Sequence, residues 1–316
     1  MALHRILVSD GLSEAGLNLL RAAGEVVANP KIGADELLAA LPEYHALVVR
    51  SRTKVTARLI EAGRNLKVIG RAGVGVDNID VAAALARGIT VVNSPLAASA
   101  AVAEHTLGLM LALARSIPTA DASMKQGRWE KSAFMGGELS GKTLGLIGIG
   151  RIGALVAERA IAFGMSILAY DPYLSAEQIR ERRAEPATFD AVLARSDYLS
   201  LHLPLTAETR GLIGSAQFAQ MKPGARLVCT ARGGVIDEDA LRAALDSGAL
   251  AGAALDVFAE EPPPPGGIAA HARVVATPHV GAQTAEAQAR AGVAIAEEVI
   301  AVLQGREPRL KVTAND

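Results

Sequence analysis

Short aliphatic and β-branched runs alternate with helical stretches along the whole chain. In the first hundred residues these runs predict five strands, near 6–8, 26–28, 47–49, 68–69 and 89–92. Helical periodicity lies between them, for example over 13–23, with Ser13 as a candidate N-cap and Gly24 as a stop signal. Strand and helix in alternation predict right-handed crossovers and a parallel sheet.

The same alternation returns in the second half of the chain. Strands are expected near 144–147, 166–170, 198–201, 227–229, 253–255 and 274–276, and a helix over about 284–303 closes the chain. At 316 residues the chain is longer than one hydrophobic core usually serves, so two domains are expected. Half of the residues are hydrophobic and few are aromatic, which suits buried parallel strands and closely packed helices.

The most informative stretch runs from residue 144 to residue 171. An apolar strand leads into G-x-G-x-x-G, formed by Gly148, Gly150 and Gly153, and a helical pattern follows. In a dinucleotide cradle the first glycine allows the turn, the second admits a pyrophosphate and the third lets helix and strand pack closely. The glycines alone are weak evidence in a chain with 31 of them, and a glycine-rich structural turn is the alternative. Asp171, at the end of the next strand, stands about where a ribose-binding carboxylate is expected, and favours the cradle.

Composition narrows the possible partners. A formal net charge of −1 argues against nucleic acid, since binding to the phosphate backbone requires clustered Lys and Arg. Cys229 is the only cysteine, so no intramolecular disulfide forms and a reducing compartment is expected. The first residues pass into a strand without a signal segment, and the most apolar helix, around 107–114, is shorter than the ~18 residues of a membrane span. We therefore expect a cytoplasmic protein that does not insert into membranes.

Polar residues follow the predicted strands of the first domain. They lie at the carboxyl ends of these strands, where parallel sheets bind ligands. Arg50, Ser51 and Arg52 follow the third strand, and Arg71 and Gly73 the fourth. Arginines in such a place can bind a phosphate or carboxylate through two parallel hydrogen bonds, which predicts a substrate with an anionic tail. Solvated surface charges are the alternative interpretation.

Several motifs together resemble the D-isomer specific 2-hydroxyacid dehydrogenases, and within them the phosphoglycerate dehydrogenases. They are the cradle, Gly-Arg-Ala-Gly-Val-Gly-Val-Asp-Asn at 70–78, Ala-Arg-Gly-Gly-Val-Ile-Asp-Glu at 231–238, Leu-Asp-Val-Phe at 255–258 with Glu-Glu-Pro at 260–262, and Pro-His-Val-Gly at 278–281. The resemblance covers essentially the whole chain. It implies an α/β fold of two doubly wound parallel-sheet domains: a flavodoxin-like substrate domain from 1–95 and 285–316, and a Rossmann dinucleotide-binding domain from 96–284.

The resemblance also implies an activity. It is an NAD-dependent oxidoreductase that interconverts a D-2-hydroxy acid and its 2-keto acid, with 3-phosphoglycerate and 3-phosphohydroxypyruvate, as in serine biosynthesis, the leading pair. A hydroxypyruvate or glyoxylate reductase and a dehydrogenase of a sulfonated hydroxy acid are the enzymatic alternatives. A nucleotide-sensing corepressor of the same fold is the alternative of another class. NAD is favoured over NADP because Asp171 would repel a 2′-phosphate.

The sequence departs from the phosphoglycerate dehydrogenase pattern in two places, one that affects substrate binding and one that affects regulation. The turn at Asn93 to Pro95 is followed by Leu96, Ala97 and Ala98, where that group usually has polar residues. Hydrogen bonds to the substrate are therefore expected to be missing there. The chain also ends at Asp316, without the regulatory domains through which some members sense serine, so feedback by serine is not expected.

The resemblance assigns roles to individual residues. Arg232 would bind the substrate carboxylate, His279 would exchange the hydroxyl proton, and Glu261 would orient the imidazole, with the choice between Glu261 and Glu260 left open. Lys131 matches a position that reaches the neighbouring subunit's site, which implies a homodimer. The residues expected to contact the cofactor are Gly148, Gly150, Arg151, Ile152, Gly153, Asp171, Leu203, Thr230, Ala231, Asp256 and Gly281, with Asp256 on the nicotinamide amide.

Other polar residues have structural interpretations. His105 lies on an apolar helix, where a lone histidine is more often a hydrogen-bonded packing residue than a site. Asp77 and Asn78 suit a turn. The remaining histidines show no ligand spacing with cysteines or carboxylates, so no metal site is expected; they are His4, His45, His202 and His271.

Overall fold

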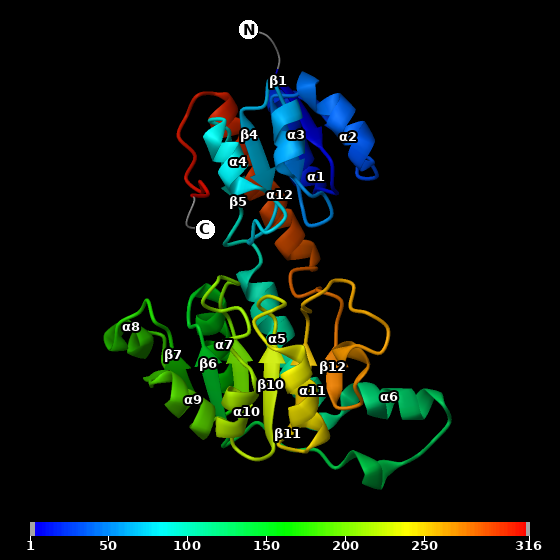
Figure 1. The fold of residues 1–316 in the computed structure, drawn as a ribbon, viewed down its shortest axis with the longest axis vertical. Helices are drawn as coiled ribbons and strands as arrows, with labels where there is room; N and C mark the ends of the chain where they lie inside the picture. Colours follow the sequence, from blue (N-terminus) through cyan, green and yellow to red (C-terminus); the bar gives the residue numbers. More distant parts are fainter. Residues whose placement is uncertain (1–3, 314–316) are drawn as a thin grey trace. The chain divides into compact units, whose positions relative to one another are not determined.

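The computed structural model describes residues 4–313, and the chain divides into two compact units (Figure 1). Unit 1 comprises residues 1–99 and 282–316, and unit 2 comprises residues 100–281. The sequence predicts breaks at 95 and 285, and the compact units break at 99 and 282. Unit 1 contains a five-stranded sheet and unit 2 a seven-stranded sheet.

The sheet of unit 1 has the order β2-β1-β3-β4-β5, with all strands parallel. This is the flavodoxin-like order of a doubly wound sheet. Its strands are β1 (His4–Val8), β2 (Gly24–Ala28), β3 (Ala46–Val49), β4 (Val68–Arg71) and β5 (Thr90–Asn93). Its helices are α1 (Glu14–Ala23), α2 (Ala34–Ala40), α3 (Ala57–Ala62), α4 (Val81–Ala86) and α12 (Ala285–Leu303), with a short 3₁₀ turn η1 (Leu41–Glu43).

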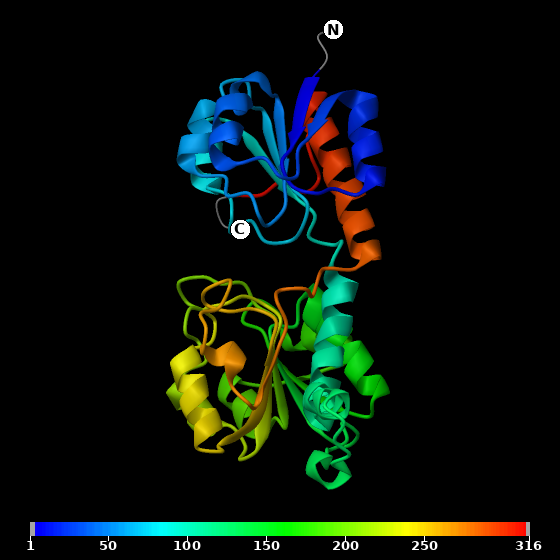
Figure 2. The ribbon, with the colours of Figure 1, turned by 90° about the vertical axis from the view of Figure 1, so that its right-hand side faces the viewer.

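The two faces of this sheet are covered by different helices. Helices α1 and α12 lie on one side of the sheet, and α2, α3 and α4 lie on the other (Figure 2). Leucines of α1 and aliphatic residues of α12 pack on Ile6 and Val8, and residues of α2, α3 and α4 pack on Leu7 and Leu47. Because successive side chains of a strand point to opposite faces, one strand serves both cores. Helices α1 and α12 approach so closely that a Cβ on Gly16 would lie 2.5 Å from the carbonyl oxygen of Gly292. Periodicity alone could not have shown that the last helix returns to the first sheet.

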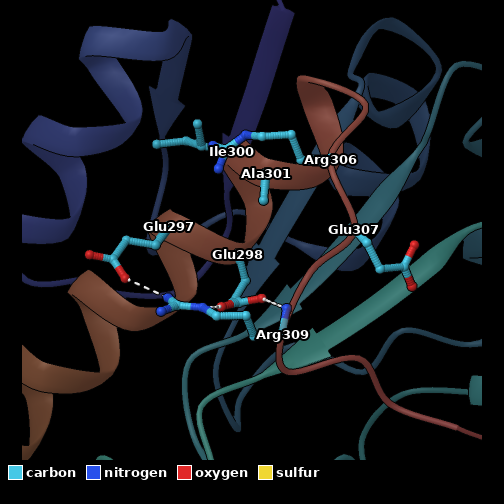
Figure 3. Close-up of a pocket in the computed structure, with 7 residues that line it drawn as sticks. All are labelled: Glu297, Glu298, Ile300, Ala301, Arg306, Glu307 and Arg309. Carbon is cyan, nitrogen blue, oxygen red and sulfur yellow. Dashed lines mark hydrogen bonds and ion pairs between the residues drawn. The ribbon is translucent and has the colours of Figure 1, made fainter.

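The segment after α12 is fixed along β5. Lys311 pairs antiparallel with Val92, and the backbone N–H groups of Arg309 and Leu310 donate to the buried carboxylate of Glu298 on α12. The Arg309 guanidinium donates to Glu298 and to Glu297 (Figure 3). A cavity of about 340 Å³ lies here, lined by Glu297, Glu298, Ile300, Ala301, Arg306, Glu307 and Arg309. These bonds and ion pairs therefore hold residues 309–311 between α12 and β5.

The sheet of unit 2 has the order β12-β11-β10-β9-β6-β7-β8. Its strands are β6 (Thr143–Ile147), β7 (Ser166–Tyr170), β8 (Glu185–Pro186), β9 (Tyr198–Leu201), β10 (Ala225–Cys229), β11 (Leu250–Leu255) and β12 (Val274–Ala276). The sequence order reverses at β6, which makes the end of β6 the topological switch point where such sheets bind ligands. The sequence does not predict the edge strand β8, because two residues, one of them a proline, give no strand periodicity.

Helices cover both faces of the second sheet as well. Residues of α5, α7 and α8 form one core with β6 and β7, and residues of α9, α10 and α11 form the other core with β9 and β10. The helices are α5 (Ser99–Arg115), α6 (Ile117–Lys125), α7 (Arg151–Ala162), α8 (Ala176–Glu181), α9 (Phe189–Arg195), α10 (Ser215–Gln220) and α11 (Glu238–Asp246), with 3₁₀ turns η2 (Lys131–Phe134) and η3 (Ile268–Ala270). Within residues 4–313 no single helix is long and apolar enough to cross a membrane; α5 and α6 meet the criteria only as a pair, bent by 64°.

Candidate active site

The three glycines after β6 have different surroundings. Gly148 has φ +86°, and a Cβ on it would lie 2.4 Å from the carbonyl oxygen of His202. A Cβ on Gly153 would lie 2.5 Å from the carbonyl oxygen of Gly148. A Cβ on Gly150, the N-cap of α7, would meet no atom within 4 Å. The fold therefore requires the first and third glycines, and the second leaves open space at a helix N-terminus, which fits a pyrophosphate.

Asp171 links the end of β7 to this turn. Its carboxylate accepts hydrogen bonds from the backbone N–H of Ile149 and of Tyr173, each at 3.0 Å. Each oxygen keeps a further lone pair, and the side chain is only half-buried, so the carboxylate can also accept from ribose hydroxyls. The carboxylate is held next to the glycine turn, as a dinucleotide requires.

The other candidate cofactor residues lie around the same end of the sheet. Arg151 and Ile152 form the first turn of α7, and Leu203 follows β9. Thr230 and Ala231 follow β10, and the Thr230 hydroxyl lies 2.9 Å from that of Thr106 on α5.

Nearby, His202 forms a hydrogen bond of 2.9 Å to the Ser200 hydroxyl, and burial lowers its pKa to about 4. His202 is therefore neutral near pH 7 and packs against the glycine turn. Within residues 4–313 no three His, Cys, Asp or Glu side chains gather closely enough to hold a metal ion.

His279 and Glu261 form a hydrogen-bonded pair. The Nδ1 atom of His279 lies 2.9 Å from Oε2 of Glu261, and Oε1 of Glu261 accepts the backbone N–H of Phe258 at 3.2 Å. Of the two neighbouring acids at 260 and 261, Glu261 is the one that bonds to the imidazole. Because the carboxylate accepts at Nδ1, this atom carries a proton, and Nε2 is the ring atom that can take up another. Both side chains are exposed and accessible to a small molecule.

Arg232 lies on the neighbouring loop, after β10. Its guanidinium donates to the carbonyl oxygen of Ala231 at 2.7 Å and is half-buried. A Cβ on Gly233 would lie 1.7 Å from the carbonyl oxygen of Phe258, so the loop of Arg232 packs directly on the loop of Glu261. Glu238 adds a second connection by accepting the N–H of Ala259 at 2.7 Å. Unit 2 thus places Arg232, Glu261 and His279 after three adjacent parallel strands.

Asp256 is buried beneath the loop of His279. Its carboxylate accepts from the Thr277 hydroxyl at 2.6 Å and from the N–H groups of Val280 and Gly281 at 2.9 and 2.8 Å. His105, on α5, approaches the same carboxylate at 3.3 Å and is hydrogen-bonded to Thr277 at 3.0 Å. In this structure Asp256 holds the 277–281 loop, and its contact with a nicotinamide amide stays a prediction.

In unit 1 Arg52 is bound by its own domain. It donates to the buried carboxylate of Asp10 at 3.1 Å, to the carbonyl oxygen of Ile32 at 3.1 Å and to that of Ser9. Three donors of the guanidinium are therefore occupied, and its charge is paired. Arg52 thus stabilises the loop after β3. A role in binding an anion stays a prediction for Arg52, as it does for Arg50 and Arg71.

Arg50 and Arg71 differ from Arg52 in their surroundings. The Arg50 guanidinium donates to the side-chain oxygen of Gln283 at 3.2 Å, and burial lowers its pKa although the charge of Asp10 opposes this. Arg71 lies across Gly73, where a Cβ would be 1.6 Å from Nη1 of the guanidinium. Glycine at 73 is therefore required for Arg71 to occupy this position.

The loop between Arg50 and Thr53 is held by two side chains. Asp10 accepts the N–H of Arg50 at 2.6 Å and that of Thr53 at 3.2 Å. The Asn78 amide donates to the carbonyl oxygens of Arg50 and Thr53, both at 2.7 Å. Ser51, at the exposed tip, is thus presented by a fixed loop. Sequence reasoning missed Asp10; its only signal is an acid two residues after a predicted strand.

Lys131 begins the 3₁₀ turn η2 and is exposed. It lies in a segment with several exposed apolar side chains, and α6 and η2 extend away from the sheet of unit 2 (Figure 1). We call this segment, residues 117–135, the apolar arm. Its large exposed hydrophobic residues are Ile117, Met124, Trp129 and Met135.

Comparison with known proteins identifies the family of the chain. A family model described as "D-isomer specific 2-hydroxyacid dehydrogenase, NAD binding domain" matches residues 107–281. The D-3-phosphoglycerate dehydrogenase of Archaeoglobus fulgidus is 48% identical over 303 residues, which cover 95% of this chain and 58% of that protein. The chain thus spans less than two thirds of this relative's length.

Solved structures are similar over their full length. A protein from Thermus thermophilus has a TM-score of 0.89 at 37% identity, covering 98% of this chain and 100% of that chain. A glyoxylate reductase from Paecilomyes thermophila has a TM-score of 0.89 at 31% identity, covering 100% of both chains.

Alanine at two of the glycines should separate folding from dinucleotide binding. Gly150→Ala adds a methyl group that meets no protein atom, so we expect an unchanged Tm and a dinucleotide Kd raised by at least ~10-fold because the pyrophosphate can no longer approach. Gly148→Ala should cost roughly 1–3 kcal/mol of folding stability, because its φ is left-handed and His202 blocks the methyl group. Thermal unfolding and fluorescence titration with NADH measure both. An unchanged Kd in Gly150→Ala would refute the cradle.

Proposed function

The chain belongs to the D-isomer specific 2-hydroxyacid dehydrogenase family, and from this premise we propose that it is an NAD-dependent oxidoreductase of D-2-hydroxy acids. We propose 3-phosphoglycerate and 3-phosphohydroxypyruvate as the substrate pair, as in serine biosynthesis. The observation that carries the proposal is the hydrogen bond between His279 and Glu261, beside Arg232 in unit 2. These residues supply an acid–base group, its orienting carboxylate and a fixed positive charge.

His279 is the proton acceptor in the direction of oxidation. The substrate hydroxyl gives its proton to Nε2, since Nδ1 already carries the proton that Glu261 accepts. The imidazolium that forms has both ring nitrogens protonated, and the Glu261 carboxylate stabilises its charge. In the direction of reduction His279 returns the proton to the carbonyl oxygen.

Arg232 binds the substrate carboxylate and polarises the carbonyl oxygen of a 2-keto acid. A guanidinium is charged at every pH at which the enzyme works and presents donors in a planar fork that matches a carboxylate. Such fixed donors favour the transition state because they do not have to reorganise as charge develops. The half-buried position of Arg232 strengthens this effect.

The cofactor would lie along the switch point of unit 2. Bound there, it would supply a hydride acceptor for the hydroxyl-bearing carbon of the substrate. Gly148, Gly150 and Gly153 would admit the pyrophosphate, and Asp171 would accept hydrogen bonds from the adenosine ribose. We propose NAD rather than NADP because a 2′-phosphate would meet the charge of Asp171, and neither Pro172 nor Tyr173 supplies a compensating charge.

A phosphate on the substrate is the finer part of the proposal. It is supported by the name of the 48% identical relative and by Arg50 and Arg71, with Ser51 and Gly73 beside them. One observation favours a second candidate, reduction of glyoxylate or hydroxypyruvate. Leu96 is 62% exposed at a position where a polar side chain is usual for phosphoglycerate dehydrogenases, and one solved structure of the same fold is a glyoxylate reductase.

One assay separates these candidates: a panel of phosphorylated, sulfonated and unsubstituted 2-hydroxy and 2-keto acids, each with NAD(H) and NADP(H). We expect 3-phosphoglycerate with NAD to give the highest kcat/KM. Neutralising Arg50 and Arg71 to Gln should lower kcat/KM for phosphorylated substrates by about 100-fold and that for glyoxylate by less than about 3-fold, because only the former use the arginines. Asp171→Ala should lower the ratio of kcat/KM with NAD to kcat/KM with NADP.

The control for the arginine variants is Arg64→Gln, which removes an exposed arginine of unit 1 before β4 rather than after a strand. It should leave every substrate unchanged. Equal losses of kcat/KM for glyoxylate and for phosphorylated acids would contradict the proposal that the protein recognises a phosphate. So would the absence of turnover of 3-phosphoglycerate by the unaltered protein. A higher kcat/KM with NADP would overturn the choice of cofactor.

We further propose a homodimer in which a second copy of the chain covers the apolar arm. Its support is the exposure of Trp129 and Met135, at 81% and 91%, together with the match of Lys131 to a family position at a neighbouring subunit's site. Side chains of this kind in one segment are typical of interfaces.

Sedimentation velocity tests the dimer. The unaltered protein should sediment at twice its mass of 32.6 kDa, and the double variant Trp129→Ser with Met135→Ser should shift to the monomer. Tyr173→Ser, which replaces an equally exposed aromatic residue outside the arm, is the control and should remain dimeric. Trp129 is the only tryptophan, so its emission should move to longer wavelength on dilution. A monomer at micromolar concentration, or a dimer in the double variant, would exclude this interface.

A further inference from the structure

The loop that carries His279 is folded around one buried side chain. Asp256, 1% exposed, accepts the N–H groups of Val280 and Gly281, and its backbone carbonyl accepts the N–H of His279 at 2.9 Å. His279 itself has φ +52°, a left-handed conformation that non-glycine residues adopt only when their surroundings impose it. The position of the His279 imidazole therefore depends on the bonds to Asp256.

His105 completes this arrangement from α5. Thr277 has one hydroxyl proton, and the 2.6 Å contact to Asp256, an acceptor only, requires that proton. The Thr277 oxygen therefore accepts from Nε2–H of His105 at 3.0 Å. This assigns the proton of a neutral His105 to Nε2, which also points to Asp256 at 3.3 Å. The result is a chain of two hydrogen bonds, from His105 to Thr277 and from Thr277 to Asp256.

Helix α5 touches both ends of the loop. A Cβ on Gly281 would lie 3.7 Å from Cδ2 of His105, 3.6 Å from Val102 and 3.0 Å from the Asp256 carboxylate. His105 thus contacts the loop at Thr277, before His279, and lies beside it at Gly281, after His279. Hydrogen bonding here also has an electrostatic effect: burial by itself would raise the pKa of Asp256, but the bonds from His105, Thr277, Val280 and Gly281 outweigh it and leave the pKa below its usual value.

We propose that His105 is a positioning residue that acts through Thr277 and Asp256 to fix the loop presenting His279 to Glu261. The inference rests on the proposed function in so far as His279 is the acid–base group. His105 touches neither the substrate nor the cofactor in this role. The loss of its hydrogen bond should impair turnover more than binding, because the loop would no longer hold the imidazole in one place.

Two substitutions separate hydrogen bonding from packing. His105→Leu removes the donor and should lower kcat by about 10-fold or more, with the KM of the hydroxy acid changed by less than about 3-fold. His105→Gln places an amide donor near the position of Nε2 and should restore most of kcat. The matched control is His271→Leu, which removes another histidine bonded to a carboxylate, Asp246 at 3.1 Å, outside this loop, and should leave kcat unchanged.

A second measurement does not depend on turnover. Amide hydrogen exchange at Val280 and Gly281, whose N–H groups are bonded to Asp256, should be slow in the unaltered protein and in His105→Gln, and at least about 10-fold faster in His105→Leu. Adding His105→Leu to Thr277→Val should have little further effect, because His105 acts through the Thr277 hydroxyl, which the valine variant already lacks.

The outcomes decide between the proposed function and the role of His105. If the unaltered protein oxidises no 2-hydroxy acid, the proposed function fails, and the exchange rates still test the role of His105. Unchanged kcat and unchanged exchange in His105→Leu would overturn the inference. So would a glutamine variant as impaired as the leucine variant, which would show that His105 acts by shape alone.

Discussion

A carboxylate buried at the end of a strand must be satisfied by hydrogen bonds, and this requirement organises the candidate active site. Asp256 follows β11 and is surrounded by donors from the loop after β12, the neighbouring strand in the sheet. An ionised group without such donors is costly to bury, so the loop has one favourable conformation. That conformation places His279 within hydrogen-bonding distance of Glu261. The hydrogen bond between His279 and Glu261, on which the proposed proton transfer depends, therefore rests on the burial of Asp256.

The same device occurs at two other places. Asp10 follows β1 and holds the loop after the adjacent β3, which carries Arg50 and Ser51. Asp171 follows β7 and accepts a bond from Ile149 in the turn after the adjacent β6. In each case an acid after one strand bonds to backbone N–H groups after its neighbour. The loops expected to bind ligands are thereby fixed by the sheet, which is how a scaffold keeps functional side chains in place.

The sequence predicts the features that depend on local patterns and misses those that depend on contacts between distant residues. The strands and the glycine turn can be predicted because they depend on local patterns of residues. In the structure a Cβ on Gly148 or on Gly153 would collide with a backbone carbonyl oxygen. The edge strand β8 has no such pattern. The binding of Arg52 by Asp10 and the bond between His105 and Thr277 join residues 42 and 172 positions apart. No local signal encodes such contacts, so the sequence predicts neither the ion pair of Arg52 with Asp10 nor the bond between His105 and Thr277. Glu261 and Glu260 can be told apart only by the distance to His279.

The central claim is that the His279–Glu261 pair transfers the proton, and steady-state turnover of His279→Ala tests it most directly. The account predicts that kcat falls by ~10² to 10⁴ fold in both directions while the dinucleotide Kd stays unchanged, since the cradle is intact. Glu261→Gln should lower kcat less, because the imidazole remains and loses only its orienting charge. Near-normal turnover by His279→Ala, in either direction and with any 2-hydroxy or 2-keto acid, would contradict the account.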